Sequence, residues 1–381
     1  MPIQIRTAIA AVPLLLTTAV FAQPSCDFSA ADAAAANMVA SRPLLPGAAV
    51  LVGNRNGIIH EAYFGSYDAG TVVPIASATK LLSGVAIMTL VEDGLIGLDT
   101  PVSSYLTEFN PQDTGLKSTM TPRQMFAHIS GLPGQEIESP ILNNPFITLA
   151  NASRQIACCV DLEVDPGTSF AYGGLSMHVT GRIAEVVSGR RWEQFFASAV
   201  SSPLGLTTID YQGLGPTLNP RISGAARSNL RESAVDSMIT DVTEGLPRRG
   251  DGPGTDTGWG YGFGGWVSRK DAAGATLEFT SPGAFGFTPW IDYERGIYGI
   301  VMVQSLNSVL SDDIDAIKLA IEAAIDACNC PADWDGSGGV DGDDIAAFFT
   351  DWQQGDADID ASGGTDGDDV AFFFLRWQAG C

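Results

Sequence analysis

Strand-like patterns occur at two distant places in this 381-residue chain, with helical patterns between them. Residues 48–53 and 58–64 are predicted to be strands joined by a turn at Asn56-Gly57, where glycine favours the positive φ of a hairpin. Short runs rich in valine, isoleucine and aromatic residues, separated by glycines, fill residues 258–304. This order predicts a mixed α/β (α+β) fold, in which one antiparallel sheet is assembled from both ends of the chain and the helices form an insertion.

Helical signals lie before, between and after these strands. Helices are expected over residues 28–41, 77–93 and 174–187, and a further one begins at the capping box of Thr121-Pro122-Arg123-Gln124. Residues 77–93 are apolar nearly all round, which is typical of a buried helix. A last helix is expected to be capped by Ser311, with Asp312 and Asp313 near its positive end and Ile314, Ile317 and Ile321 on one face.

The N-terminal residues 1–22 have the pattern of a signal peptide. A positive Arg6 precedes an apolar run that ends at Val20-Phe21-Ala22, with small residues at positions −3 and −1 of a cleavage site. We therefore expect a secreted, periplasmic or surface-associated protein that starts near Gln23 and has no membrane span. Export permits disulfides; the six cysteines allow 15 pairings, and Cys330 and Cys381 are candidates to clip the C-terminal segment.

The net charge of −24 argues against nucleic acid and anionic membranes as partners. Much of this charge lies in residues 330–381, which suggests a separate module.

That C-terminal segment is an internal repeat with a period of 25 residues. Residues 333–354 and 358–379 each begin Asp-x-Asp-x-Ser-Gly-Gly-x-Asp-Gly-Asp-Asp and continue into an apolar helical pattern. Oxygen groups at positions 1, 3, 5, 7, 9 and 12 have the spacing of a calcium loop. The predicted Ca²⁺ ligands are Asp333, Asp335, Ser337, Gly339, Asp341 and Asp344 in the first loop, and Asp358, Asp360, Ser362, Gly364, Asp366 and Asp369 in the second. The alternative is a disordered acidic tail, but the repetition and the aromatic residues favour a folded module.

The duplicated segment resembles the loop-helix repeats of dockerin-type modules. The resemblance implies a small all-α module over residues 330–381 with structural calcium and a protein partner.

Ser77 and Lys80 have the spacing of a nucleophile and its base. Residues i and i+3 share a face of a helix, and a serine hydroxyl needs an adjacent base to attack a carbonyl group. Alone, this pair is equally compatible with a capping serine and a solvated lysine.

Further motifs give the pair its context. Besides the segment that begins at Thr121 and ends "HISGLP" at Pro133, these are "PGTSFAYGG" (166–174), "GYGFGGWV" (260–267) and "SPGAFG" (281–286). Residues from about 45 to 325 resemble the serine β-lactamase and penicillin-binding-protein superfamily, nearest its class C β-lactamases, D-alanyl-D-alanine peptidases and esterases, and the domain is expected to span residues 23–329. The sequence motifs of this superfamily include the Ser-x-x-Lys element. The resemblance implies an antiparallel sheet flanked by helices, a helical subdomain and a site between them.

The resemblance also implies roles for individual residues. Ser77 is expected to be the acylated nucleophile, Lys80 its base and Tyr172 the proton relay, with the backbone N–H groups of Ser77 and Ala284 as the oxyanion hole. The residues expected to bind a small acyl substrate are Gly174, Ser281, Gly283 and Tyr261. No catalytic cofactor is expected, and His128 is interpreted as structural.

Two positions depart from the β-lactamase pattern. Gly174 stands where asparagine is usual, and Ser281 where a lysine is usual. These departures favour ester or D-Ala-D-Ala-peptide hydrolysis, with weak or no β-lactamase activity. The alternative is a catalytically degenerate ligand-binding protein displayed through its C-terminal module.

Overall fold

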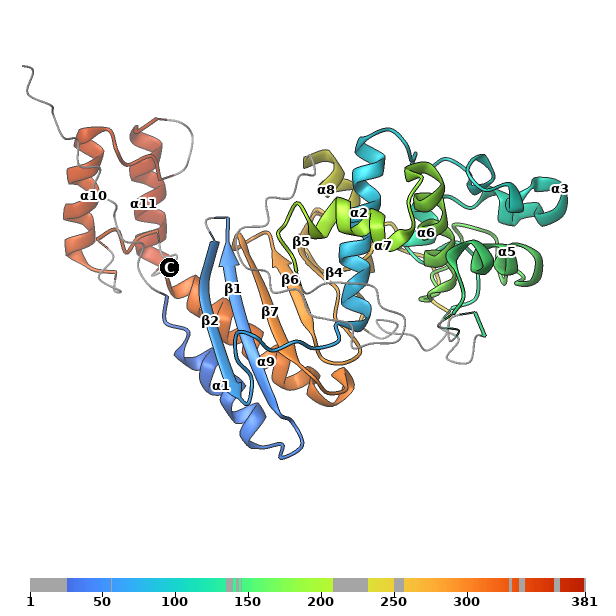
Figure 1. Cartoon of the computed structure of the whole chain (residues 1–381). Coiled ribbons are helices and arrows are strands. Elements are labelled where there is room, and N and C mark those ends of the chain that lie inside the picture. The colour runs from blue at the N-terminus through green and yellow to red at the C-terminus, as the bar shows by residue number, and fades with distance from the viewer. Residues whose placement is uncertain are drawn as a thin grey trace, which may run out of the picture. The chain divides into compact units, whose positions relative to one another are not determined.

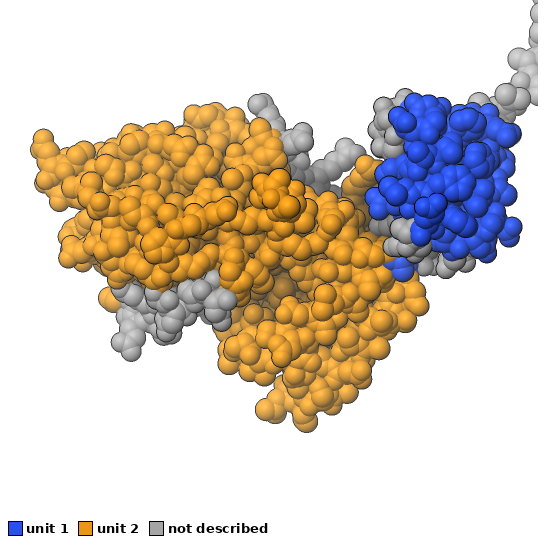
Figure 2. Space-filling view, turned by 180° about the vertical axis from the view of Figure 1, so that it is seen from behind, with its two compact units in different colours: residues 1–26, 327–381 blue, residues 27–326 orange. Residues whose placement is uncertain are grey.

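The computed structural model describes residues 26–55, 57–134, 140–141, 144, 146–207, 232–249, 257–328, 331–335, 340–359 and 364–379. These residues divide into two compact units, which consist of residues 27–326 and of residues 1–26 with 327–381 (Figure 2). The predicted signal peptide, 1–22, lies outside the described residues, as do Cys330 and Cys381.

The larger unit is built on one antiparallel sheet drawn from both ends of the chain. Its strands are β1 Gly47–Asn54, β2 Gly57–Gly65, β3 Gly260–Tyr261, β4 Trp266–Lys270, β5 Thr276–Thr280, β6 Thr288–Asp292 and β7 Ile297–Val303. Their order in the sheet is β2-β1-β7-β6-β5-β4-β3. The pairing of β1 with β7, in which Val50 lies opposite Val301, joins the two ends of the chain. The predicted sheet is confirmed.

Helices cover the sheet and form a second layer beside it (Figure 1). They are α1 Ser29–Ala40, α2 Thr79–Glu92, α3 Pro111–Thr114, α4 Pro122–Phe126, α5 Leu149–Cys159, α6 Leu175–Ser188, α7 Trp192–Phe196, α8 Glu232–Ile239 and α9 Asn307–Cys328. The largest buried cluster joins α2 to α4, α5, α6, α7 and α8. Helix α2 is therefore the rigid element around which the helical part is packed, as its apolar sequence predicts.

The prediction that Ser311 caps the last helix is wrong. Helix α9 begins at Asn307, one turn earlier. Leu310 is fully buried and extends the apolar face of Ile314, Ile317 and Ile321 by one turn, so burial of this face sets where the helix begins. Asp313 consequently pairs with Arg42 instead of lying at the helix start.

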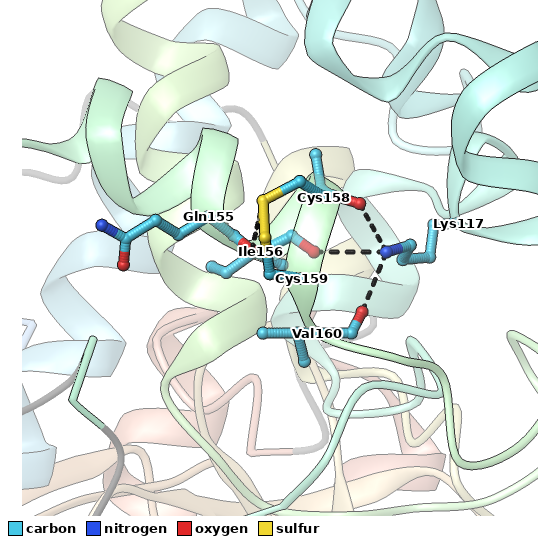
Figure 3. The surroundings of a disulfide bond; sticks show 7 residues. Lys117, Gln155, Ile156, Cys158, Cys159 and Val160 are labelled. Carbon is cyan, nitrogen blue, oxygen red and sulfur yellow. Dashed lines mark hydrogen bonds between the residues drawn. A yellow bond between two sulfur atoms is a disulfide. The ribbon is translucent and has the colours of Figure 1, made fainter.

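Two disulfides occur among the described residues. Cys26 is bonded to Cys328 at the end of α9, and the neighbouring Cys158 and Cys159 are bonded to each other at the end of α5. Figure 3 shows that the Lys117 side chain approaches the same helix end, where its ammonium group donates to the carbonyls of Ile156, Ala157 and Val160. A cation that binds the last carbonyls of a helix stabilises its negative end, although burial lowers the pKa of Lys117.

The smaller unit contains two helices, α10 Gly342–Gln354 and α11 Gly367–Ala379. Phe348 and Phe373, which are 25 residues apart, stack with ring centroids 4.1 Å apart. Trp352 Nε1 donates to the carbonyl of Asp366 at 2.8 Å, and Trp377 Nε1 donates to that of Asp341 at 3.0 Å. Each repeat thus closes on the loop of the other, so the described part of the segment is a folded helical pair rather than a disordered tail.

Candidate active site

The Ser77 hydroxyl and the Lys80 side-chain nitrogen are in contact. Ser77 lies in a single 3-10 turn, Ala76–Ala78, and Lys80 lies in the first turn of α2. Lys80 Nζ lies 3.1 Å from Ser77 Oγ, and both residues are half-buried. The i, i+3 spacing therefore brings a candidate base within hydrogen-bonding reach of a candidate nucleophile.

The backbone immediately before Ser77 is strained. Ala76 has φ +45°, a left-handed conformation that residues with a Cβ rarely adopt. Such conformations cost about 1–3 kcal/mol and cluster at functional sites, where the surrounding structure holds them in place. Here the strained residue is Ala76, which directly precedes Ser77 and helps to set its orientation.

The turn after β5 packs against this strained segment. The buried Ser281 donates its hydroxyl to the backbone carbonyl of Ser77 at 3.1 Å. A Cβ at Gly283 would lie 2.2 Å from the carbonyl oxygen of Ile75, so only glycine permits this approach. Ala284 is exposed beside this turn, and its carbonyl accepts a hydrogen bond from the Asn307 N–H at 3.0 Å. Ser281 and Gly283 therefore hold the Ser77 segment in place, whereas substrate binding by either residue remains a prediction.

Tyr172 also lies next to Lys80. Lys80 Nζ lies 4.9 Å from the centroid of the Tyr172 ring, within the range of a cation–π contact. The ring is buried and stacks on Trp266 with centroids 5.5 Å apart. The structure thus brings Tyr172, which is distant in the sequence, to the Ser77–Lys80 pair.

The rings of His128 and Tyr261 pack against the ring of Tyr172. The Gly173 N–H donates to His128 Nδ1 at 3.3 Å, which assigns the ring proton of a neutral imidazole to Nε2. His128 is buried, and its ring centroid lies 4.4 Å from that of Tyr172, as expected for a structural residue. Tyr261 was predicted to contact substrate, but its side chain is fully buried. Tyr261 therefore packs behind Tyr172 as part of the core. Burial raises the pKa of its hydroxyl far above the ordinary value.

Neutral His128 should make the folded protein less stable in mild acid. Burial and the nearby Lys80 charge hold its folded-state pKa well below the ordinary value of 6.5. Below pH 6.5 the unfolded chain therefore binds a proton that the folded chain does not, and the free energy of unfolding falls by up to about 1.4 kcal/mol per pH unit. Because asparagine tolerates the positive φ of +58° at this position, His128→Asn is the matched variant. Urea denaturation between pH 7 and 5 should show a shallower decline for the variant, and an equally steep decline would contradict this assignment.

A cavity of about 480 Å³ adjoins the site. Both Lys80 and Gly174 belong to its wall. The other residues of this wall could not be predicted from the sequence, because they come from separate segments and carry no motif.

The first repeat loop of the smaller unit places carboxylates together. Oxygens of Asp333, Asp335 and Asp344 lie within 4.8 Å of one another. Asp344 is fully buried, and its two oxygens accept the backbone N–H groups of Asp335 at 3.1 Å and Asp341 at 2.8 Å. These acceptor-only groups fit the preference of Ca²⁺ for oxygen ligands.

The second loop repeats part of this arrangement. Buried Asp369 accepts the N–H groups of Ile359 at 2.9 Å and Asp366 at 2.7 Å. Asp358 and Gly364 of this loop also lie among the described residues. Four of the predicted ligands lie outside the described residues, namely Ser337, Gly339, Asp360 and Ser362.

A second acidic group in the larger unit has a different character. Glu278, Asp292 and Glu322 also bring carboxylate oxygens together. Arg269 and Arg295 lie 2.8 and 2.9 Å from Asp292, and Lys318 pairs with Glu278. Because cations already neutralise this group, we interpret it as an ion-pair network.

Comparison with known proteins assigns the larger unit. A family model described as Beta-lactamase matches residues 33–324. The chain belongs to the beta-lactamase family. Members of this family are generally serine hydrolases, and the antiparallel sheet flanked by helices agrees with the β-lactamase/transpeptidase fold.

Individual relatives of this beta-lactamase-family chain are distant. Penicillin-binding protein 4 of Amycolatopsis lactamdurans is 28% identical over 214 residues, which are 54% of each chain. The match therefore spans about half the length of that relative. The crystal structure of a proposed beta-lactamase from Bacteroides dorei DSM 17855 is 25% identical, with a TM-score of 0.64 over 76% of this chain and 98% of that one.

A second similar structure is EstCE1, described as a hydrolase with promiscuous acyltransferase activity. It is 19% identical, with a TM-score of 0.58 over 77% of this chain and 98% of that one. At this identity the likeness concerns the fold. No helix among the described parts of this beta-lactamase-family chain has the length and hydropathy needed to cross a membrane.

Proposed function

We propose that this protein is a serine hydrolase that acts on small esters or amides through an acyl-enzyme. The observation that carries the proposal is the 3.1 Å contact between Lys80 Nζ and Ser77 Oγ. A lysine amine at this distance can take the hydroxyl proton as the oxygen attacks.

The proposed reaction has two steps. Ser77 Oγ forms a bond to the substrate carbonyl carbon while its proton passes to Lys80, and the backbone N–H groups of Ser77 and Ala284 stabilise the oxyanion. Collapse of the tetrahedral intermediate breaks the bond to the leaving group, which takes the proton through Tyr172. Water then attacks the acyl-enzyme, and its proton returns to Ser77 as the acid departs. The Tyr172 ring lies beside the proposed base, with its centroid 4.9 Å from Lys80 Nζ.

The substrate class follows from two missing side chains. Gly174 offers no amide to hold the amide side chain of a β-lactam, and Ser281 offers no cation for its carboxylate. The Ser281 hydroxyl is instead used on the Ser77 carbonyl. We therefore favour esterase or D-Ala-D-Ala-peptidase activity with weak or no β-lactamase activity, a view that the described activity of EstCE1 supports.

A side-by-side assay of short-chain p-nitrophenyl esters, a D-Ala-D-Ala peptide and nitrocefin tests this proposal. Ester or peptide turnover above that of nitrocefin is expected. If no substrate turns over and no acylating probe adds mass to the folded protein, the alternative of a degenerate ligand-binding protein is preferred.

We propose a second role for residues 330–381, as a dockerin-like module that holds structural Ca²⁺ and binds a protein partner. The convergence of Asp333, Asp335 and Asp344 supports calcium in the first loop. Bound Ca²⁺ would neutralise these carboxylates and fix the loop against its helix.

Removal of Ca²⁺ should destabilise the smaller unit. EDTA is expected to lower its melting temperature by several degrees or more, because three clustered carboxylates then repel one another. Tryptophan fluorescence measures the melting. Asp335→Asn should weaken the response to Ca²⁺, whereas Asp356→Asn, an equal change of charge at an exposed position outside the cluster, should retain it. Identical melting with EDTA and with Ca²⁺ would contradict the calcium proposal.

We further propose that the protein is exported. The pattern of residues 1–22 supports this proposal, as do the two disulfides, which form in oxidising compartments. Intact mass measurement of protein from the culture medium or periplasm should give a chain that starts near Gln23. A chain that retains residues 1–22 in the cytoplasm would contradict export.

A further inference from the structure

The cavity beside Lys80 lies among α2, α6, α7 and the segment before α5. These helices contact one another in the helical part of the larger unit (Figure 1). Its wall consists of Thr79, Lys80 and Ser83 from α2; Gly174 and the α6 residues Met177, His178, Gly181 and Glu185; and Ile147, Thr148, Leu149, Arg191, Trp192 and Glu193. Its volume of about 480 Å³ is within the usual range for sites that bind small molecules.

The polar groups of this wall already have partners. Thr79 Oγ1 donates to the Ala76 carbonyl at 2.7 Å, and Ser83 Oγ donates to the Thr79 carbonyl at 2.8 Å. Other polar wall groups are paired as well, namely His178 Nδ1 with the Gly174 carbonyl, Thr148 Oγ1 with the Asn151 N–H, and Glu185 with Arg182 and the Trp192 N–H. Ligand groups that need hydrogen bonds would therefore have to compete with bonds within the protein.

The remaining wall is apolar. Ile147, Leu149, Met177 and Trp192 supply large hydrophobic surfaces. Gly181 leaves room between them, since a Cβ there would lie 3.1 Å from Leu149 Cδ1 and 3.8 Å from Trp192 Cε3. Burial of an uncharged hydrocarbon group against these surfaces is energetically favourable.

Two of the charged residues, Arg191 and Glu193, lie at the exposed part of the wall. The side chains of Arg191 and Glu193 are 77% and 53% exposed and lie 3.7 Å apart, near enough to offset each other's charge. Glu185 is paired with Arg182, and Lys80 Nζ contacts Ser77 Oγ, so these two charged wall residues are engaged with other protein groups.

The cavity is also connected to the proposed chemistry. Lys80 contacts Ser77 Oγ through Nζ and belongs to the cavity wall. Gly174, which follows Tyr172 by two residues, belongs to that wall too.

We propose that this cavity binds the straight hydrocarbon chain of the acyl group that Ser77 receives, so that the preferred substrates are esters of medium-chain fatty acids. The inference rests on the proposed hydrolase function. The cavity volume lies within the range of small-molecule sites, which leaves room for a hydrocarbon chain of several carbons.

The experiment compares p-nitrophenyl acetate, butyrate, hexanoate and octanoate. In the wild-type protein, kcat/KM should rise by up to about fourfold for each methylene that becomes buried. Gly181→Leu places a side chain in the cavity and should reduce the hexanoate-to-acetate ratio of kcat/KM by about tenfold or more. Val186→Leu enlarges an exposed residue of the same helix outside the cavity wall and should leave this ratio unchanged.

A second variant guards against misfolding of Gly181→Leu. Leu149→Ala enlarges the cavity and should move the preferred acyl chain to a greater length. A hexanoate-to-acetate ratio that neither variant changes, with ester turnover that still requires Ser77, would overturn the cavity proposal alone. Absence of turnover for every ester together with absence of Ser77 labelling would overturn the hydrolase proposal instead.

Discussion

Ser77→Ala is expected to reduce kcat/KM for p-nitrophenyl esters by at least about three orders of magnitude, because the variant lacks the oxygen that accepts the acyl group. The fold should survive, since Ser77 is half-buried and its backbone carbonyl can still accept the Ser281 hydroxyl. Circular dichroism and thermal melting verify the fold, and steady-state kinetics measure the loss.

A matched serine variant distinguishes this loss from general damage. Ser237 lies on α8, where its hydroxyl donates to the Ser233 carbonyl of the same helix at 2.9 Å. Ser237→Ala removes a hydroxyl from the same unit and should retain ester turnover. Survival of esterolysis in Ser77→Ala would show that another group is the nucleophile.

Lys80→Met is expected to cause a loss of similar size. Methionine retains much of the apolar stem of lysine but has no amine to take the Ser77 proton. The rate of acylation, measured in single turnovers, should fall by about three orders of magnitude, whereas substrate binding should change little.

Lys80→Arg separates the role of a base from the role of a positive charge. Arginine keeps the charge and can lie over the Tyr172 ring, but its guanidinium does not release a proton in proteins. If Lys80 acts as the base, Lys80→Arg should be as inactive as Lys80→Met. Near-normal turnover in Lys80→Arg would indicate a purely electrostatic role. Lys270→Arg, in a side chain that pairs with Asp241 at 2.9 Å, is the control and should remain active.

Features set by local periodicity could be predicted from the sequence. The i, i+3 spacing of Ser77 and Lys80 predicted their contact, and the Thr121 capping box is present at the start of α4. Strands β1 and β7 pair in the middle of one sheet, as expected for short apolar runs that are buried almost throughout. Helix α9 shows the weakness of such reasoning, since a capping signal at Ser311 was outweighed by burial of Leu310.

Features that depend on contacts across the chain could not be predicted. Ser281 reaches the Ser77 carbonyl across 204 residues, and no local pattern encodes that hydrogen bond. Nor does a pattern encode the strained Ala76, because a left-handed alanine is imposed by its surroundings. Tyr261 has a motif that suggested a substrate contact, whereas aromatic packing buries it fully.

Intact mass spectrometry of the protein treated with a fluorophosphonate probe, followed by peptide mapping, tests the proposed nucleophile most directly. The account predicts one adduct on the peptide that contains Ser77, formed much more slowly in Lys80→Met and absent in Ser77→Ala. A protein that turns over esters while its adduct lies on another residue, or that remains unmodified at Ser77, would contradict it.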